Sequence, residues 1–130
     1  MGCDIHLHTE VKIDGIWHHY GSPHIRRSYA LFSKIADVRN CGDEPNPLTP
    51  HPGLPSDATE LTKLSRLLED GDCEGWIDTR QIKELAKWFE DKNPYDPWGL
   101  EGVFDFVFQN GWAGIPNENV EDARFIFWFD

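Results

Sequence analysis

The chain is poor in cysteine and has no long apolar run. Its 130 residues include three cysteines, an odd number with no pair at the C-x-x-C spacing. This argues against a disulfide framework and against a structural zinc site, so we expect reduced thiols, as in a cytoplasmic protein. The longest apolar run is a handful of residues, and no basic leader precedes an apolar block at the N-terminus. We therefore expect neither a membrane span nor a signal peptide.

Basic residues are also scarce. The 12 Lys and Arg face 23 Asp and Glu, a net charge of -11. Non-specific binding to nucleic acid needs a surplus of basic residues, so we expect no nucleic acid polymer as a partner. The deficit is uneven: residues 1–40 carry four acids and five bases, a net of +1, with five of the six histidines, and the remainder carries 19 acids and seven bases, a net of -12. The first third of the chain is therefore the part that could attract a small anion.

A β-hairpin is the clearest local signal. Residues 3–13 alternate, the dipeptide Asp14-Gly15 favours a two-residue turn, and residues 16–20 form the return strand. This turn places Glu10 opposite His19. The face expected to join the core carries Cys3, Ile5, Leu7, Val11, Ile13, Ile16 and Tyr20. The other face carries Asp4, His6, His8, Glu10, Lys12, Trp17 and His19.

Three amphipathic helices are predicted. The first covers residues 29–36. The second begins near Asp57, with a capping box to Glu60, and ends at Gly71. For the third, Asp78 and Gln81 indicate the N-terminus. Their expected buried stripes are Leu31, Phe32, Ile35 and Ala36; Leu61, Leu64, Leu67 and Leu68; and Ile82, Leu85, Ala86 and Phe89.

The remaining segments complete the predicted fold. Five prolines make residues 41–58 a long loop, and loops of this length in a small domain are often functional. Residues 103–108 alternate as a strand before a tight turn at Asn110-Gly111, and residues 125–129 are apolar on both faces, as expected for a central strand. With 39% hydrophobic residues, the sequence predicts one α+β domain over residues 1–130. It contains an antiparallel sheet with an N-terminal β-hairpin, about three helices and a central C-terminal strand.

The polar face of the hairpin is the first candidate site. Asp4, His6, His8 and Glu10 form a row along one strand, and His19 lies across from Glu10. Asp4, His6 and His8 are candidate ligands of a divalent metal, because carboxylate and imidazole groups are common metal ligands. Acid–base catalysis by His6, His8, Glu10 and His19 is a second possibility, with a carboxylate orienting a histidine. The alternative is an outer face that is simply solvated.

Three arginines form the second candidate site. Arg26 and Arg27 precede the first predicted helix, and Arg39 follows it. Guanidinium groups bind phosphate through paired hydrogen bonds, and Trp17 and Tyr29 could stack on a base beside them. The alternative is that these arginines pair with the many acidic residues of the same chain.

Two resemblances bear on function. The segment from Asp4 to Thr9 resembles the first metal motif of polymerase-and-histidinol-phosphatase type phosphoesterases, which are about twice this length. A wider resemblance, to a family of small bacteriophage proteins of unassigned function, rests on Gly2-Cys3-Asp4-Ile5-His6, Tyr29-Ala30-Leu31-Phe32, Val38-Arg39-Asn40, Gly53-Leu54-Pro55, Trp112-Ala113-Gly114 and Phe127-Trp128-Phe129-Asp130. The chain departs from that family's pattern at Pro52 and at residues 72–75. The resemblance implies a phage protein in the host bacterial cytosol, and by analogy one that counters nucleotide-based immune signalling.

Three hypotheses follow. The leading one is a homo-oligomeric protein that binds and sequesters a small phosphorylated nucleotide, of the cyclic dinucleotide or cyclic ADP-ribose type, and requires no cofactor. Its expected ligand-binding residues are Asp4, His6, His8, Trp17, His19, Arg26, Arg27, Tyr29 and Arg39. The second is a phosphodiesterase that cleaves such a signal with the hairpin's polar face, with a divalent metal possible. The third is an acidic protein that masks a host DNA-binding protein.

Overall fold

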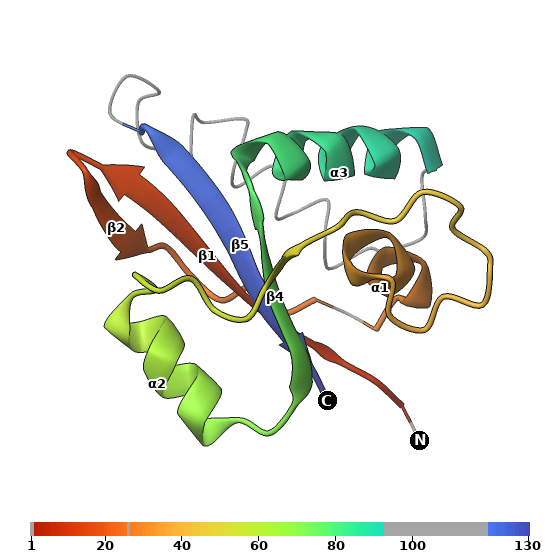
Figure 1. Cartoon of the computed structure of the whole chain (residues 1–130), viewed down its shortest axis with the longest axis horizontal. Coiled ribbons are helices and arrows are strands. Elements are labelled where there is room, and N and C mark those ends of the chain that lie inside the picture. The colour runs from red at the N-terminus through yellow and green to blue at the C-terminus, as the bar shows by residue number, and fades with distance from the viewer. Residues whose placement is uncertain (1, 26, 93–119) are drawn as a thin grey trace.

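The computed structural model describes residues 2–25, 27–92 and 120–130 (Figure 1). Its elements in chain order are β1 (Ile5–Ile13), β2 (Ile16–His19), α1 (Tyr29–Ala36), β3 (His51–Pro52), α2 (Glu60–Leu68), β4 (Asp72–Asp78), α3 (Thr79–Lys92) and β5 (Asp122–Phe129). The strands form one sheet in the order β2-β1-β5-β4-β3, and every neighbouring pair is antiparallel. The predicted α+β class is therefore confirmed, with the hairpin at one edge of the sheet and β5 in the middle.

The hairpin has the predicted register. Glu10 pairs with His19, and Ile13 pairs with Ile16. The turn residues Asp14 and Gly15 have φ angles of 52° and 76°, as a two-residue turn that follows the twist of the strands requires. One prediction for the hairpin is wrong: Ile16 is 60% exposed, because it lies at the tip of the edge strand, where none of the described helices covers it.

The sheet is covered on both faces. Phe125, Phe127 and Phe129 of β5 pack with the apolar residues of β1, α1 and α3, whereas Ile126 and Trp128 pack on the opposite face. Figure 1 places α1 and α3 on one side of the sheet and α2 on the other. Residues 125–129 are almost fully buried, which confirms that this apolar stretch is a central strand covered on two sides.

Helices α1 and α3 begin where the sequence predicts. Helix α1 covers the predicted residues, and the Ser28 side chain accepts a hydrogen bond from the amide of Leu31. At α3 the amide of Gln81 donates to Asp78 at 3.0 Å and the amide of Asp78 donates to Gln81 at 3.1 Å, a reciprocal capping box.

Helix α2 differs from its prediction in two ways. Its N-cap is Thr59, whose side chain accepts from the amide of Thr62, so the predicted capping box between Asp57 and Glu60 is wrong. The predicted burial of its leucines is also wrong, because all of them are exposed: Leu61 by 51%, Leu64 by 52%, Leu67 by 82% and Leu68 by 76%. The helix instead turns a polar face to the sheet. Thr62, Ser65, Arg66 and Glu69 on that face are buried or half-buried.

Some sequence predictions fall on parts of the chain that the structure does not describe. The strand predicted at residues 103–108 and the turn at Asn110-Gly111 lie outside the described residues. The loop predicted at residues 41–58 contains the short edge strand β3, which pairs with β4. In the described part of the chain, none of the helices has the length and apolar character needed to cross a membrane.

Candidate functional site

The polar row of the hairpin lies beneath α2. On the neighbouring strand β5, His6 faces Trp128, His8 faces Ile126, and Glu10 faces Arg124. His8 and Glu10 are among the buried polar residues, exposed by 3% and 0%. The alternative of a solvated outer face is therefore wrong for these two side chains, because α2 and the segment before it cover them.

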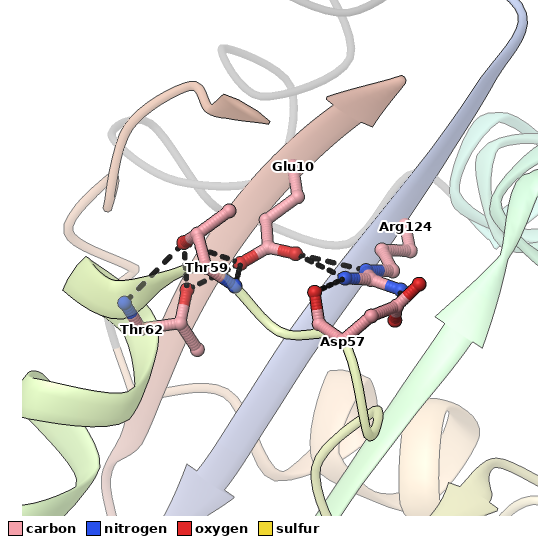
Figure 2. A network of polar contacts seen from close by, with 5 residues as sticks. All are labelled: Glu10, Asp57, Thr59, Thr62 and Arg124. Carbon is pink, nitrogen blue, oxygen red and sulfur yellow. Dashed lines mark hydrogen bonds and ion pairs between the residues drawn. The ribbon is translucent and has the colours of Figure 1, made fainter. Parts of the chain in front are cut away.

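Glu10 forms the centre of a buried network, drawn in Figure 2. One carboxylate oxygen accepts from Nε of Arg124 at 2.9 Å. The other accepts from the amide and hydroxyl of Thr59, at 3.1 and 2.8 Å, and from the hydroxyl of Thr62 at 2.6 Å. Because Thr59 caps α2, the carboxylate also lies at the positive end of the helix dipole. Glu10 therefore fixes α2 on the sheet.

The same network holds the guanidinium of Arg124. Its Nη1 donates to the carboxylate of Asp57 at 2.7 Å, and this hydrogen bond holds the pKa of Asp57 below its usual value. The guanidinium carbon lies 3.8 Å from the ring centre of Trp17, a cation–π contact. Trp17, predicted to stack on a nucleotide base, therefore already has a cationic partner within the chain.

His8 and His19 form a hydrogen-bonded pair. Nδ1 of His8 lies 2.9 Å from Nε2 of His19, while Nδ1 of His19 accepts from the amide of Gly21 at 3.3 Å. A neutral His19 must then carry its proton on Nε2 and donate it to Nδ1 of His8, so His8 carries its own proton on Nε2. Within the described residues that buried Nε2 has no hydrogen-bond partner. An unpartnered buried donor costs roughly 1–3 kcal/mol, so stability alone does not explain a histidine at this position.

Burial keeps both histidines neutral at pH 7. Desolvation, with a smaller repulsion from His19, lowers the pKa of His8 from 6.5 to about 4 despite the opposing attraction of Glu10. Desolvation likewise lowers the pKa of His19. A buried neutral pair of this kind can relay a proton, but it does not attract a phosphate at neutral pH.

These shifts predict an acid-sensitive fold. Because the pKa of His8 is lower in the folded than in the unfolded chain, its contribution is fully present above pH 6.5 and is lost as the pH falls to about 4. We expect a loss of about 3 kcal/mol of unfolding free energy over that interval, measured by urea denaturation. The carboxylates Asp4, Asp57, Glu74 and Asp78 also have lowered pKa values, and their contributions are lost only as the pH falls through their ordinary values of 3.8 to 4.5 and below.

The control for this prediction is an exposed histidine. His8→Gln should flatten the profile between pH 6.5 and 4, leaving the smaller part due to His19. His24→Gln, at an exposed position, should leave the profile unchanged. An unchanged slope in His8→Gln would show that His8 is not the group that titrates.

The outer end of the row is taken up by ion pairs. Both carboxylate oxygens of Asp4 accept from Arg27, at 3.0 Å each, and this hydrogen bonding lowers the pKa of Asp4. His6 lies between Glu69 at 2.9 Å and Asp130 at 3.0 Å. Within residues 2–25, 27–92 and 120–130, no group of three or more histidine, cysteine or acidic side chains is placed to hold a metal ion. Metal binding by Asp4, His6 and His8 stays a prediction.

A cavity of about 330 Å³ lies on the other side of the sheet, beside α1. We call it the Arg39 pocket, and it is lined by Tyr29, Ala30, Ser33, Arg39, Asp43, Glu44 and Trp88. Helix α1, the loop that follows it and helix α3 all contribute to the lining. Its volume is within the usual range for small-molecule sites, about 300–1,000 Å³.

The charges of the Arg39 pocket are balanced. Glu44 accepts from the indole of Trp88 at 2.9 Å, and its carboxylate lies 3.9 Å from the ammonium of the buried Lys34. Arg39 is exposed, with its guanidinium 5.5 Å from the ring centre of Tyr29. Across the described chain no ion pair with Arg39 is found. Lys34 neutralises Glu44. The charged groups of the pocket that can contact a ligand are therefore those of Arg39 and the exposed Asp43.

A second cavity, of about 500 Å³, also reaches Arg39. It is lined by Gly2, Cys3, Asp37, Val38, Arg39, Asp72, Cys73, Phe129 and Asp130. Arg39 itself has a φ of 57°, an uncommon conformation for a residue other than glycine. Arg39 lies two residues after Asp37, the C-cap of α1, which is also left-handed.

The structure divides the predicted site residues between two faces. Tyr29 and Arg39 meet in one pocket, whereas His6, His8, Trp17 and His19 lie on the other face of the sheet with the buried Glu10. Asp4 and Arg27 pair with each other, and Arg26 lies outside the described residues. The sequence reading missed Ser33, Asp43, Glu44 and Trp88 as pocket residues. The one signal for any of them is the proline-rich loop, which contains both acids.

Comparisons with models of protein families, with curated proteins and with solved structures return no match.

Proposed function

We propose that the chain binds and sequesters a small phosphorylated nucleotide, of the cyclic dinucleotide or cyclic ADP-ribose type, in the Arg39 pocket. The observation that carries this proposal is the guanidinium of Arg39, exposed and without an ion pair within the described chain, at the border of two cavities. Its donors are therefore available for a phosphate, which guanidinium groups bind through two parallel hydrogen bonds.

Other groups in the pocket suit the rest of a nucleotide. Tyr29 and Trp88 offer aromatic surface for a base, and the carboxylate of Asp43 can accept hydrogen bonds from ribose hydroxyls. Because Glu44 is neutralised by Lys34, only Asp43 opposes the charge of a phosphate within this pocket. The site therefore favours a ligand that carries hydroxyl groups and a base as well as phosphate over inorganic phosphate alone.

The size of the two cavities supports a ligand with two nucleoside units. About 330 Å³ on one side of Arg39 and about 500 Å³ on the other each offer room for a nucleoside. A cyclic dinucleotide has its phosphates between two such units, and a cyclic ADP-ribose derivative, with a single adenine, has its pyrophosphate between two riboses. Either arrangement suits the position of Arg39 in the lining of both cavities. The acidic lining of the larger cavity is suited to hydroxyl and amino groups.

Binding should depend on the Arg39 guanidinium. A charge-assisted hydrogen bond contributes about 1.5–3 kcal/mol, so Arg39→Gln is expected to weaken nucleotide binding roughly 10- to 100-fold in isothermal titration calorimetry. Arg80→Gln makes the same change in net charge at an exposed position on α3 that lines neither cavity, and should change affinity by less than about twofold. If wild type, Arg39→Gln and Arg80→Gln bind the nucleotide with equal affinity, its binding site is not the Arg39 pocket. If none of them binds it, the proposal is wrong.

A further inference from the structure

Helix α2 has its apolar face outward. Leu61, Leu64, Leu67 and Leu68 are each exposed by half or more, and together they form an apolar patch on the solvent side of the helix. Figure 1 shows α2 at the outside of the molecule, with no other element of the described chain beyond it. Isolated exposed leucines are common on protein surfaces, but four on one nine-residue helix indicate an interaction surface.

The orientation of α2 is fixed by bonds to the rest of the chain. Thr62 is fully buried and donates to Glu10 at 2.6 Å. Arg66 donates from Nε to Glu74 at 3.0 Å and from Nη2 to the carbonyl of Gly71 at 2.8 Å. Turning the leucines toward the sheet would break all of these bonds and remove the Thr62 hydroxyl from the buried carboxylate of Glu10. The exposed leucines are therefore a stable property of the fold.

We propose that two copies of the chain associate through this leucine face, with the two α2 helices antiparallel across a twofold axis. The spacing of the leucines supports this arrangement. Leu61 and Leu68 lie at equal distances in sequence on either side of the midpoint between residues 64 and 65. A twofold axis at that point therefore sets Leu61 against the partner's Leu68, with Leu64 near the axis. Such an interface uses the same patch on both copies.

Charge also favours a second copy at this place. The chain has a net charge of -11, so two copies repel each other over most of their surfaces. On the outward side of α2 the charged residues are Glu60 and Lys63, which lie 3.7 Å apart and cancel, because Arg66 faces the sheet and pairs with Glu74. The leucine face is thus a place where two such acidic chains can approach.

The area of the patch fits the core of a modest interface. Four leucines exposed to this degree present on the order of a few hundred Å² of apolar surface. A stable interface takes roughly 800 Å² from each partner, with an apolar core and a polar rim. The leucines supply that core, and Glu60 and Lys63 beside them belong to the rim.

Sedimentation velocity across a wide range of protein concentration tests the dimer. The wild-type chain should pass from monomer to dimer as its concentration rises, and Leu64→Glu with Leu67→Glu should remain monomeric. The milder pair Leu64→Ala with Leu67→Ala should weaken association roughly 100-fold while keeping the helix, because each copy loses two buried leucines. Lys83→Glu makes a charge reversal at an exposed position on α3, away from the leucines, and should still dimerise.

Two results would overturn the proposal. A wild-type chain that stays monomeric at every concentration has no self-association at this face. A double glutamate variant that dimerises as well as wild type, with unchanged circular dichroism, places the contact elsewhere. Neither result depends on nucleotide, so this test is separate from that of the Arg39 pocket.

Discussion

Replacing Glu10 with leucine is expected to lower the free energy of unfolding by about 3–5 kcal/mol. The substitution leaves the guanidinium of Arg124, which is only 3% exposed, without its buried counter-ion, and removes the acceptor for Thr59 and Thr62. An unpaired buried charge is among the most destabilising changes in a protein interior, because water no longer solvates it. Urea denaturation followed by circular dichroism measures the loss.

Asp57 provides a matched control on the same arginine. Its side chain is 63% exposed, so its ion pair with Arg124 is well solvated and should contribute less than about 1 kcal/mol. Asp57→Ala should therefore lower stability far less than Glu10→Leu. The double variant Glu10→Leu with Arg124→Leu should recover part of the loss, since no buried charge remains. If Glu10→Leu and Asp57→Ala cost the same, the buried pair does not hold α2 on the sheet.

Gly71→Ala is expected to cost about 3 kcal/mol or more, the second large effect. Gly71 has a φ of 152°, which residues with a side chain rarely adopt, and an added Cβ would lie 2.6 Å from the carbonyl oxygen of Phe129. That oxygen belongs to the central strand and cannot move without shifting the sheet. The midpoint of urea denaturation should fall accordingly.

Gly53→Ala separates backbone strain from steric contact. Gly53 also has a positive φ, 73°, but no atom lies within 4 Å of an added Cβ. Its substitution should cost only about 1 kcal/mol, the penalty of a left-handed conformation. Equal costs for the two alanines would mean that the contact between Gly71 and the end of β5 is looser than described.

Local patterns predicted the elements of this fold whose burial follows hydrophobicity. The turn at Asp14-Gly15 fixed the hairpin register, and the apolar run at residues 125–129 identified the central strand. Strand β4 was missed because its sequence is polar and contains Gly75, so its extended form comes from pairing with β5. Periodicity alone does not carry that information.

Helix α2 shows why a correct helix can be oriented wrongly. The helical periodicity of the four leucines is the strongest hydrophobic signal in this segment, so the sequence predicts that they are buried. In the structure the buried carboxylate of Glu10 needs several donors, and Thr59 and Thr62 supply them from the opposite face of the helix. Thr59 and Thr62 are 49 and 52 residues from Glu10 along the chain, and no local pattern connects them.

The sequence predicted which types of residue form the candidate site, but not which of them lie together. Tyr29 and Arg39 were singled out as an aromatic and a cationic ligand group, and they do lie in one pocket. The sequence analysis placed the histidines of the hairpin in the same site as Tyr29 and Arg39. Alternation assigns the side chains of a strand to its two faces, but it does not show which face α1 covers. The hairpin's polar face is covered by α2, and the pocket beside α1 lies on the opposite side of the sheet.

Nucleotide depletion is the most direct test of the proposed function. The purified chain is mixed with a panel of cyclic dinucleotides and cyclic ADP-ribose species, the unbound nucleotide is measured by liquid chromatography, and the protein is then heated to release what it holds. We predict that wild type depletes one class of nucleotide and releases it intact, and that Arg39→Gln leaves it in solution. Release of a changed product would instead support the phosphodiesterase alternative. Depletion of none of these nucleotides would contradict both and leave the masking of a host DNA-binding protein as the remaining hypothesis.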